Sequence, residues 1–162
     1  MAYTTEGQIV DLLAEKWKEG NRLVVKELVV PVIDQVYYDN FLEGREQVRI
    51  DLAAYDTVTD QVIFVEAENG LYLQHPQIYL PFCNILYILC PEDQSSFREE
   101  QFKWSKERGI GIIEVKKSGL LSYSLDPKIR QIFPKVQAFV KSRLFRRIKK
   151  ESGRDSKIDI KQ

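Results

Sequence analysis

The feature that most constrains the fold is a pair of apolar segments, residues 48–55 and 61–67, separated by a short polar stretch. The first segment alternates with the period of two that is typical of a strand. Its two expected faces are Val48, Ile50, Leu52 and Ala54 on one side, and Arg49, Asp51, Ala53 and Tyr55 on the other. The second segment, QVIFVEA, is almost continuously apolar and β-branched, which indicates a strand buried on both faces. The sequence therefore predicts a hairpin with a connection of four or five residues centred on Val58.

This hairpin brings acidic side chains together. Its register places Asp51 opposite Glu66, or one residue away, where cross-strand neighbours lie ~5 Å apart. Glu66 and Glu68 share one face because the side-chain period of a strand is two. A lone buried carboxylate costs several kcal/mol or takes up a proton, and a bound cation removes that cost. Asp51, Glu66 and Glu68 are therefore candidate ligands of Mg²⁺ or Mn²⁺. The alternative is that the strands simply emerge into water at this point.

The spacing of these acids matches a known pattern. Asp51, fourteen further residues and then Glu66-Ala67-Glu68 resemble the core motif of the PD-(D/E)xK nuclease superfamily. Asp51 takes the Asp position and Glu66 the second acidic position. Glu68 stands where the family normally has Lys, which weakens the inference of catalysis, although a few restriction-type members also carry Glu there.

The remaining elements follow in an order that agrees with this motif. We expect a helix capped by Thr4 or Thr5, a strand over 22–30, a short helix over 77–84, a strand over 85–90, a surface helix over 92–108, strands over 109–115 and 119–125, and a basic helix from Asp126. Expected apolar anchors include Phe97, Phe102 and Trp104, and then Ile129, Ile132 and Phe133. Residues 31–46 fit no single element. Tyr37, Tyr38 and Phe41 are candidates for the core or for stacking on nucleotide bases, and Arg45 and Arg49 are candidates for contacting a phosphate or for balancing the local acids. The expected fold class is α/β (α+β), a restriction-endonuclease-like αβββαβ core in which helices flank a mixed central sheet.

A closer resemblance covers roughly residues 8–150. The segments VRIDLAAYD, VIFVEAE, IYLPFCNILYILCP and GIGIIEVKKSGLL, followed by a basic terminal helix, resemble the MmcB-type DNA-repair branch of the superfamily. The residues on its characteristic positions are Arg49, Asp51, Glu66, Tyr79, Cys83, Leu86 and Tyr87.

The resemblance implies metal-dependent hydrolysis of DNA phosphodiesters. It implies that Asp51 and Glu66 hold Mg²⁺ and that Glu68 is a further ligand or the general base. Gln77 is similar to a glutamine that RecB-type members use near substrate. Glu6 or Glu15 of the first helix is a candidate acid beside the metal, and the alternative, which helix surfaces favour, is a solvated surface residue. His75 is a candidate ligand or base, or an ordinary loop histidine. Compensating positive charge is expected from Arg49, Lys116 or Lys117.

Composition sets the remaining expectations. The chain has 162 residues, 44% of them apolar, which suits one domain over 1–150 and a flexible tail over 151–162. The lack of a membrane segment or signal pattern favours a cytoplasmic protein, and Cys83 and Cys90 are expected to be free thiols. Residues 126–162 hold twelve Lys and Arg against four Asp and Glu, so nucleic acid is the expected partner. The alternatives are a non-catalytic nuclease-fold protein that binds nucleic acid or a protein, and a homodimer formed through an exposed strand edge.

Overall fold

The computed structural model describes residues 5–31, 47–69, 74–92 and 97–155. In chain order the elements are α1 (Glu6–Lys18), β1 (Arg22–Pro31), β2 (Gln47–Asp56), β3 (Gln61–Ala67), the 3-10 helix η3 (His75–Phe82), β4 (Ile85–Pro91), α2 (Arg98–Arg108), β5 (Gly111–Val115), β6 (Leu121–Leu125) and α3 (Pro134–Asp155). The candidate aromatic residues Tyr37, Tyr38 and Phe41, and the candidate cation Arg45, lie outside the described residues.

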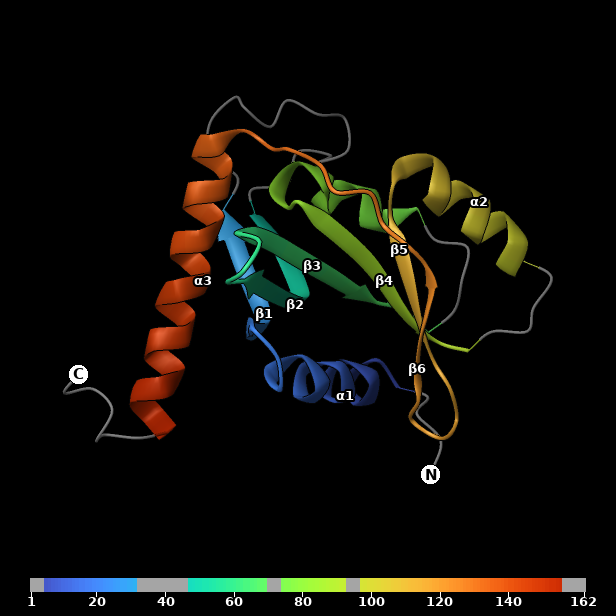
Figure 1. The fold of residues 1–162 in the computed structure, drawn as a ribbon, viewed down its shortest axis with the longest axis horizontal. Helices are drawn as coiled ribbons and strands as arrows, with labels where there is room; N and C mark the ends of the chain where they lie inside the picture. Colours follow the sequence, from blue (N-terminus) through green and yellow to red (C-terminus); the bar gives the residue numbers. More distant parts are fainter. Residues whose placement is uncertain (1–4, 32–46, 70–73, 93–96, 156–162) are drawn as a thin grey trace.

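All six strands form one mixed sheet in the order β1-β2-β3-β4-β5-β6 (Figure 1). The β3–β4 and β4–β5 pairs are parallel, and the other three pairs are antiparallel. Helices cover both faces, which confirms the predicted mixed sheet flanked by helices. The predicted hairpin is confirmed as β2 and β3, joined by the four residues 57–60.

Helix α1 covers one face of the sheet. It begins at a capping box, in which the Gln8 backbone N–H donates to the Thr5 hydroxyl and the Thr5 backbone N–H donates to the Gln8 side chain, both at 3.2 Å. Its apolar stripe belongs to one buried cluster with residues of β1 to β5, and the buried members of the stripe are Ile9, Val10, Leu13, Ala14 and Trp17. The cap therefore fixes the start of the helix, and with it the position of Glu6.

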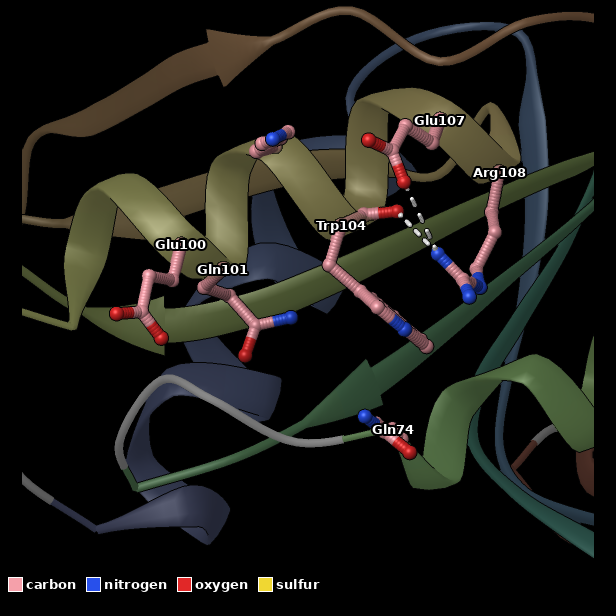
Figure 2. Close-up of a pocket in the computed structure, with 7 residues that line it drawn as sticks. Gln74, Glu100, Gln101, Trp104, Glu107 and Arg108 are labelled. Carbon is pink, nitrogen blue, oxygen red and sulfur yellow. Dashed lines mark hydrogen bonds and ion pairs between the residues drawn. The ribbon is translucent and has the colours of Figure 1, made fainter.

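Helix α2 lies on the opposite face, beside η3. The Arg98 guanidinium donates to both carboxylate oxygens of the buried Glu114, at 3.1 and 2.7 Å, and the Ser124 hydroxyl donates to the same carboxylate at 2.6 Å. A cavity of about 270 Å³ lies between Gln74 and α2. The Trp104 side chain points from α2 toward Gln74 (Figure 2). The prediction that Phe97 anchors this helix is wrong, because Phe97 is 53% exposed where the helix begins.

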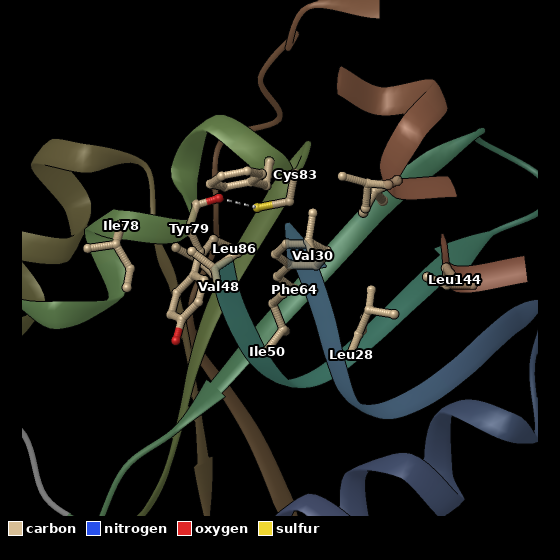
Figure 3. Close-up of a cluster of buried hydrophobic side chains, with 14 of the residues drawn as sticks. Leu28, Val30, Val48, Ile50, Phe64, Ile78, Tyr79, Cys83, Leu86 and Leu144 are labelled. Carbon is tan, nitrogen blue, oxygen red and sulfur yellow. Dashed lines mark hydrogen bonds between the residues drawn. The ribbon is translucent and has the colours of Figure 1, made fainter. Parts of the chain in front are cut away.

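The larger apolar cluster lies on this same face and is completed by α3 (Figure 3). Its buried members include Leu28, Val30, Ile50, Phe64 and Leu144. The prediction of a helix from Asp126 is wrong, because residues 126–133 are extended and α3 begins at Pro134. Backbone hydrogen bonds hold the extended segment, from Lys128 N–H to the Gly109 carbonyl and from Arg130 N–H to the Asn84 carbonyl. Ile129 and Phe133 are consequently exposed, at 64% and 65%.

The C-terminal helix continues to Asp155, five residues into the segment expected to be a flexible tail. Its buried side chains are Val136, Val140 and Leu144. Both cysteines are buried free thiols, as predicted. Among the described residues, no helix is both long enough and apolar enough to cross a membrane.

Both strands of the β1–β2 pair change face at the same point. Val48, Ile50 and Ala53 pack in the α3-side cluster, whereas Leu52 and Ala54 pack in the α1-side cluster. The strict alternation predicted for residues 48–55 is therefore wrong beyond Asp51. The ladder is irregular at the same point: Lys26 pairs with Leu52 and Leu28 pairs with Ile50, and Glu27 between them has φ 55°. This left-handed backbone at a residue other than glycine is uncommon, and it lies directly across from Asp51.

Candidate functional site

The candidate site forms where the β2–β3 hairpin opens. Cross-strand pairing of β2 with β3 ends at Leu52 and Val65, so Asp51 and Glu66 are the next residues on the two strands. Asp51 Oδ2 accepts the backbone N–H of Ala67 at 2.8 Å, and the Asp51 and Glu66 carboxyl groups are joined by a hydrogen bond. The prediction that these two acids meet across the hairpin is confirmed.

Glu66 is the buried member of the pair, with 6% of its surface exposed. Two residues of η3 lie beside it: His75 Nε2 is 3.4 Å from Glu66 Oε2, and the Tyr79 side chain lowers the pKa of the Glu66 carboxyl. The Tyr79 hydroxyl donates to the Arg49 carbonyl at 2.9 Å, and the His75 and Tyr79 rings pack edge to face with centroids 5.8 Å apart. Because η3 places these rings over the end of β3, water has little access to the Glu66 carboxyl.

Burial dominates the protonation of this group. It raises the pKa of Glu66 to about 10, with further upward contributions from the hydrogen bond to Asp51 and from the Asp51 charge. The Tyr79 side chain acts in the opposite direction. Without a cation, Glu66 therefore keeps its proton at neutral pH, and the pair carries one negative charge fewer than its residue types suggest.

Glu68 lies two residues further on and is half-buried. Its backbone N–H donates to the Leu89 carbonyl at 2.8 Å, which continues the parallel β3–β4 ladder past the end of β3. Burial, and then the charges of Glu6 and Asp51, raise the pKa of Glu68 to about 7. Glu6 is thus the first-helix acid that lies near the site, whereas Glu15 lies on the exposed side of α1.

An open cavity of about 400 Å³ adjoins Asp51. It lies between the first turns of α1 and the irregular part of β1, and its lining residues are Glu6, Gly7, Val10, Asp11, Lys26, Glu27 and Asp51. Lys26 Nζ and Asp11 Oδ1 form an ion pair at 2.8 Å on its rim. The Glu27 carboxylate, which also lines this cavity, forms an ion pair with Arg49.

The donor atoms here suit a hard divalent cation. Mg²⁺ takes oxygen ligands, commonly one or two carboxylates with the rest of its shell filled by water, and the Asp51–Glu66 pair supplies that set. Within the described residues, no three or more His, Cys, Asp or Glu side chains are arranged to hold a metal ion. Asp51 and Glu66 therefore form an open two-carboxylate site with Glu68 adjacent, and the expected three-carboxylate cluster does not form.

The other predicted site residues lie at varying distances from this pair. Gln77 is half-buried on η3, and its described hydrogen bond is from its backbone N–H to the Gln74 carbonyl at 3.2 Å. The residues of η3 that lie beside Glu66 are His75 and Tyr79 instead. Lys116 and Lys117 form part of the exposed connection between β5 and β6, and no described interaction joins them to the carboxylates.

Sequence reasoning weighed His75 but gave Tyr79 no role in the site. The reason is the start of the helix: it was expected at Gln77, with His75 in the preceding loop, whereas η3 begins at His75 and contains both residues. Nothing in the sequence marked Glu27 as a left-handed residue, since its neighbours Lys26 and Leu28 read as ordinary strand residues.

Comparison with known proteins gives information about the fold and none about the function. No protein-family model matches the chain, and no curated protein matches it. Among solved structures it is similar to SPO1766, a protein of unknown function from Silicibacter pomeroyi, with a TM-score of 0.59 and 12% sequence identity. The similarity covers 94% of this chain and 92% of that chain. The whole arrangement of elements therefore recurs in a second protein of very different sequence.

Proposed function

We propose that the protein is a metal-dependent nuclease that hydrolyses phosphodiester bonds in DNA, with a restriction-endonuclease-like core. The observation that carries this proposal is the hydrogen-bonded Asp51–Glu66 pair, held at the point where two strands separate. Its support from the sequence is the resemblance of Asp51, Glu66 and Glu68 to the PD-(D/E)xK motif. A buried acid pair with an open side is costly for a structural role and useful for holding a cation.

The residues have distinct roles in this proposal. Asp51 and Glu66 bind Mg²⁺ or Mn²⁺, and Glu66 gives up its proton when the cation binds. The bound cation would polarise the scissile phosphate and lower the pKa of a water ligand. His75 and Tyr79 orient the Glu66 carboxyl and exclude bulk water from it. We assign Glu68, two residues beyond Glu66 and close to Asp51, the role of accepting the proton of the attacking water.

One observation favours a second candidate, a non-catalytic nuclease-fold protein that binds nucleic acid. Position 68 carries a half-buried acid where the related motif has Lys, and no described cation contacts it. In this alternative the Asp51–Glu66 pair persists as part of the fold, and DNA binding does not depend on a divalent ion.

The experiment that separates the two combines metal binding with cleavage. Thermal unfolding of the wild type, Glu66→Gln and Asp51→Asn would be measured in EDTA, Mg²⁺ and Mn²⁺, alongside nicking of supercoiled plasmid. Glu99→Gln is the matched control, because Glu99 is an exposed acid on α2. We expect Mn²⁺ to raise the midpoint and support nicking in the wild type and Glu99→Gln only. If neither protein gains stability or cuts DNA, the hydrolase proposal is wrong.

A further inference from the structure

One face of α3 carries a row of cations that the candidate active site does not use. Arg143, Arg146, Arg147 and Lys150 follow the spacing i, i+3, i+4 and i+7, which places them side by side on the helix surface. With Leu28 and Val29 of β1 they line a cavity of about 270 Å³. We call these four residues the basic stripe. The sheet-facing side of α3, formed by Val136, Val140 and Leu144, is buried, so the stripe lies at the sheet edge next to β1.

One member of the stripe is fixed in place by the backbone of β1. The Arg147 guanidinium donates to the Glu27 carbonyl at 3.0 Å and to the Lys26 carbonyl at 2.9 Å, and it also pairs with Glu151 at 3.2 Å. It therefore satisfies the two carbonyls where β1 is irregular. These bonds fix the position of the Arg147 guanidinium at this end of the cavity in the absence of a ligand.

The other three cations of the stripe differ from Arg147 because no described carboxylate neutralises them. Arg146 and Lys150 are exposed and Arg143 is half-buried, and within the described ranges no acidic side chain pairs with any of the three. Like charges at these helical spacings repel one another and destabilise the helix. An anion in the cavity would relieve this repulsion, and guanidinium groups match the geometry of phosphate oxygens in particular.

The stripe and the candidate active site share one wall. Lys26 and Glu27, whose carbonyls hold Arg147, also line the cavity that contains Asp51. Val29, which lines the basic cavity, pairs with Arg49, and Arg49 is two residues from Asp51 on β2. Across that distance the strand rises by roughly 7 Å. A polyanion lying in the basic cavity therefore has a short path over β1 to the acid pair.

We infer that the basic stripe binds backbone phosphates of the nucleic acid whose cleavage is proposed above, and holds that strand across β1 toward Asp51 and Glu66. This inference rests on the proposed function for its partner. Charge complementarity favours a polyanionic strand, because three of the four cations have no described acidic partner.

A lipid surface fits the stripe less well. Membrane-binding helices bury an apolar face in the headgroup region. Here the apolar face of α3 is already packed on the sheet, and Phe145, 39% exposed, lies against the Tyr55 ring with centroids 5.2 Å apart.

The test is DNA binding by the full chain in EDTA, measured by fluorescence anisotropy over a range of salt concentrations. The test variant is R143A/R146A/K150A, which leaves Arg147 in place, and the control is K16A/K18A/K106A, which removes the same charge from exposed positions elsewhere. We expect the test variant to bind DNA about tenfold or more weakly, and its salt slope to fall by roughly 0.9 for each phosphate that the stripe no longer neutralises. The control should remain within about twofold of the wild type at the same salt concentration.

Unfolding midpoints would show that both variants fold, and the milder R143Q/R146Q variant would replace the triple if that one is unstable. The inference fails if both triples lose affinity equally, if inorganic phosphate binds the stripe but DNA does not, or if the stripe is required for binding to phosphatidylserine vesicles instead. Nicking by the wild type keeps the two proposals apart. Stripe-dependent binding without nicking defeats the hydrolase alone, and nicking with stripe-independent binding defeats the stripe alone.

Discussion

Asp51 Oδ2 accepts the backbone N–H of Ala67 at 2.8 Å, one position beyond Leu52 and Val65, the last residues paired between β2 and β3. The Asp51 side chain thus takes the place of a main-chain carbonyl as the acceptor for the Ala67 N–H where the two strands separate. The same carboxylate hydrogen-bonds to Glu66, so a single side chain closes the hairpin and forms half of the proposed metal site.

Two substitutions at Asp51 should separate these contributions. Asp51→Ala leaves the part-buried Ala67 N–H without its acceptor, and we expect the free energy of unfolding to fall by about 1–3 kcal/mol. Asp51→Asn retains an acceptor oxygen and should lose less than about 1 kcal/mol. Both should lose stabilisation by Mn²⁺. Urea unfolding in EDTA and in Mn²⁺ measures both effects, and equal stability of the two variants in EDTA would contradict the closing role.

Glu66 predicts an unusual dependence of stability on pH. Its pKa of about 10 in the folded protein lies far above the ordinary value of 4.5, so the unfolded chain loses this proton first as pH rises. The stability that protonation gives is complete below about pH 4.5 and is lost between there and pH 10, by up to about 1.4 kcal/mol per pH unit. Glu68, with a pKa of about 7, acts in the same direction over a narrower range.

Glu66→Gln mimics the protonated side chain and should therefore be more stable than the wild type at pH 8 in EDTA, by about 1 kcal/mol or more. Its unfolding midpoint should also change less between pH 5 and pH 9. Thermal unfolding at several pH values provides the measurement, with Glu99→Gln expected to follow the wild-type curve. A variant less stable than the wild type at pH 8 would show that Glu66 is ionised in the metal-free protein.

Metal binding should be coupled to proton release. A carboxyl group that is protonated in the free protein must ionise to bind a cation, so Mn²⁺ affinity should increase from pH 6 to pH 8. Calorimetric titrations in two buffers with different ionisation enthalpies would count the protons released. We expect about one proton per Mn²⁺ at pH 7, and Glu66→Gln should release fewer. An affinity independent of pH would exclude Glu66 as a ligand.

The Arg98–Glu114 pair gives a prediction away from the site. Glu114 is 2% exposed and its carboxylate is held by Arg98 and by Ser124, so Arg98→Ala leaves a buried charge without its cation. Because the Arg98 side chain is itself 40% exposed and Ser124 still donates to Glu114, we expect a loss of about 1–3 kcal/mol. The double substitution Arg98→Met with Glu114→Met should be much closer to the wild type. Urea unfolding of Arg98→Met, Glu114→Met and the double variant tests this. If the loss of the double variant equals the sum of the losses of the two single variants, Arg98 and Glu114 do not act as a pair.

Elements with strong local signals were predictable. The apolar run of β3, the turn at 57–60 and the capping residue Thr5 each depend on a few neighbouring residues, and each lies where the sequence indicated. The meeting of Asp51 and Glu66 followed from the length of one hairpin connection. These are short-range relationships, which a sequence specifies directly.

Features that depend on distant packing were not predictable. Ile129, Ile132 and Phe133 have helical spacing, yet main-chain bonds to Gly109 and Asn84 hold their segment extended, and Pro134 then begins the helix. The change of face at Asp51 coincides with the left-handed backbone of Glu27 on the neighbouring strand. The position of Tyr79 beside Glu66 depends on how η3 lies over β3. In each case the deciding partner is remote in sequence.

The β2–β3 ladder ends before the candidate site, so the acidic side chains of the site lie outside the paired part of the hairpin. Asp51, Glu66 and Glu68 all follow the last pair of that hairpin, so the apolar registers of the core do not depend on which polar side chains stand there. Position 68 can accordingly be exchanged without repacking the interior. Glu68→Lys therefore separates the two candidate functions. If Glu68 accepts the proton of the attacking water, nicking by this variant should fall, whereas a gain of nicking over the wild type would support the non-catalytic alternative.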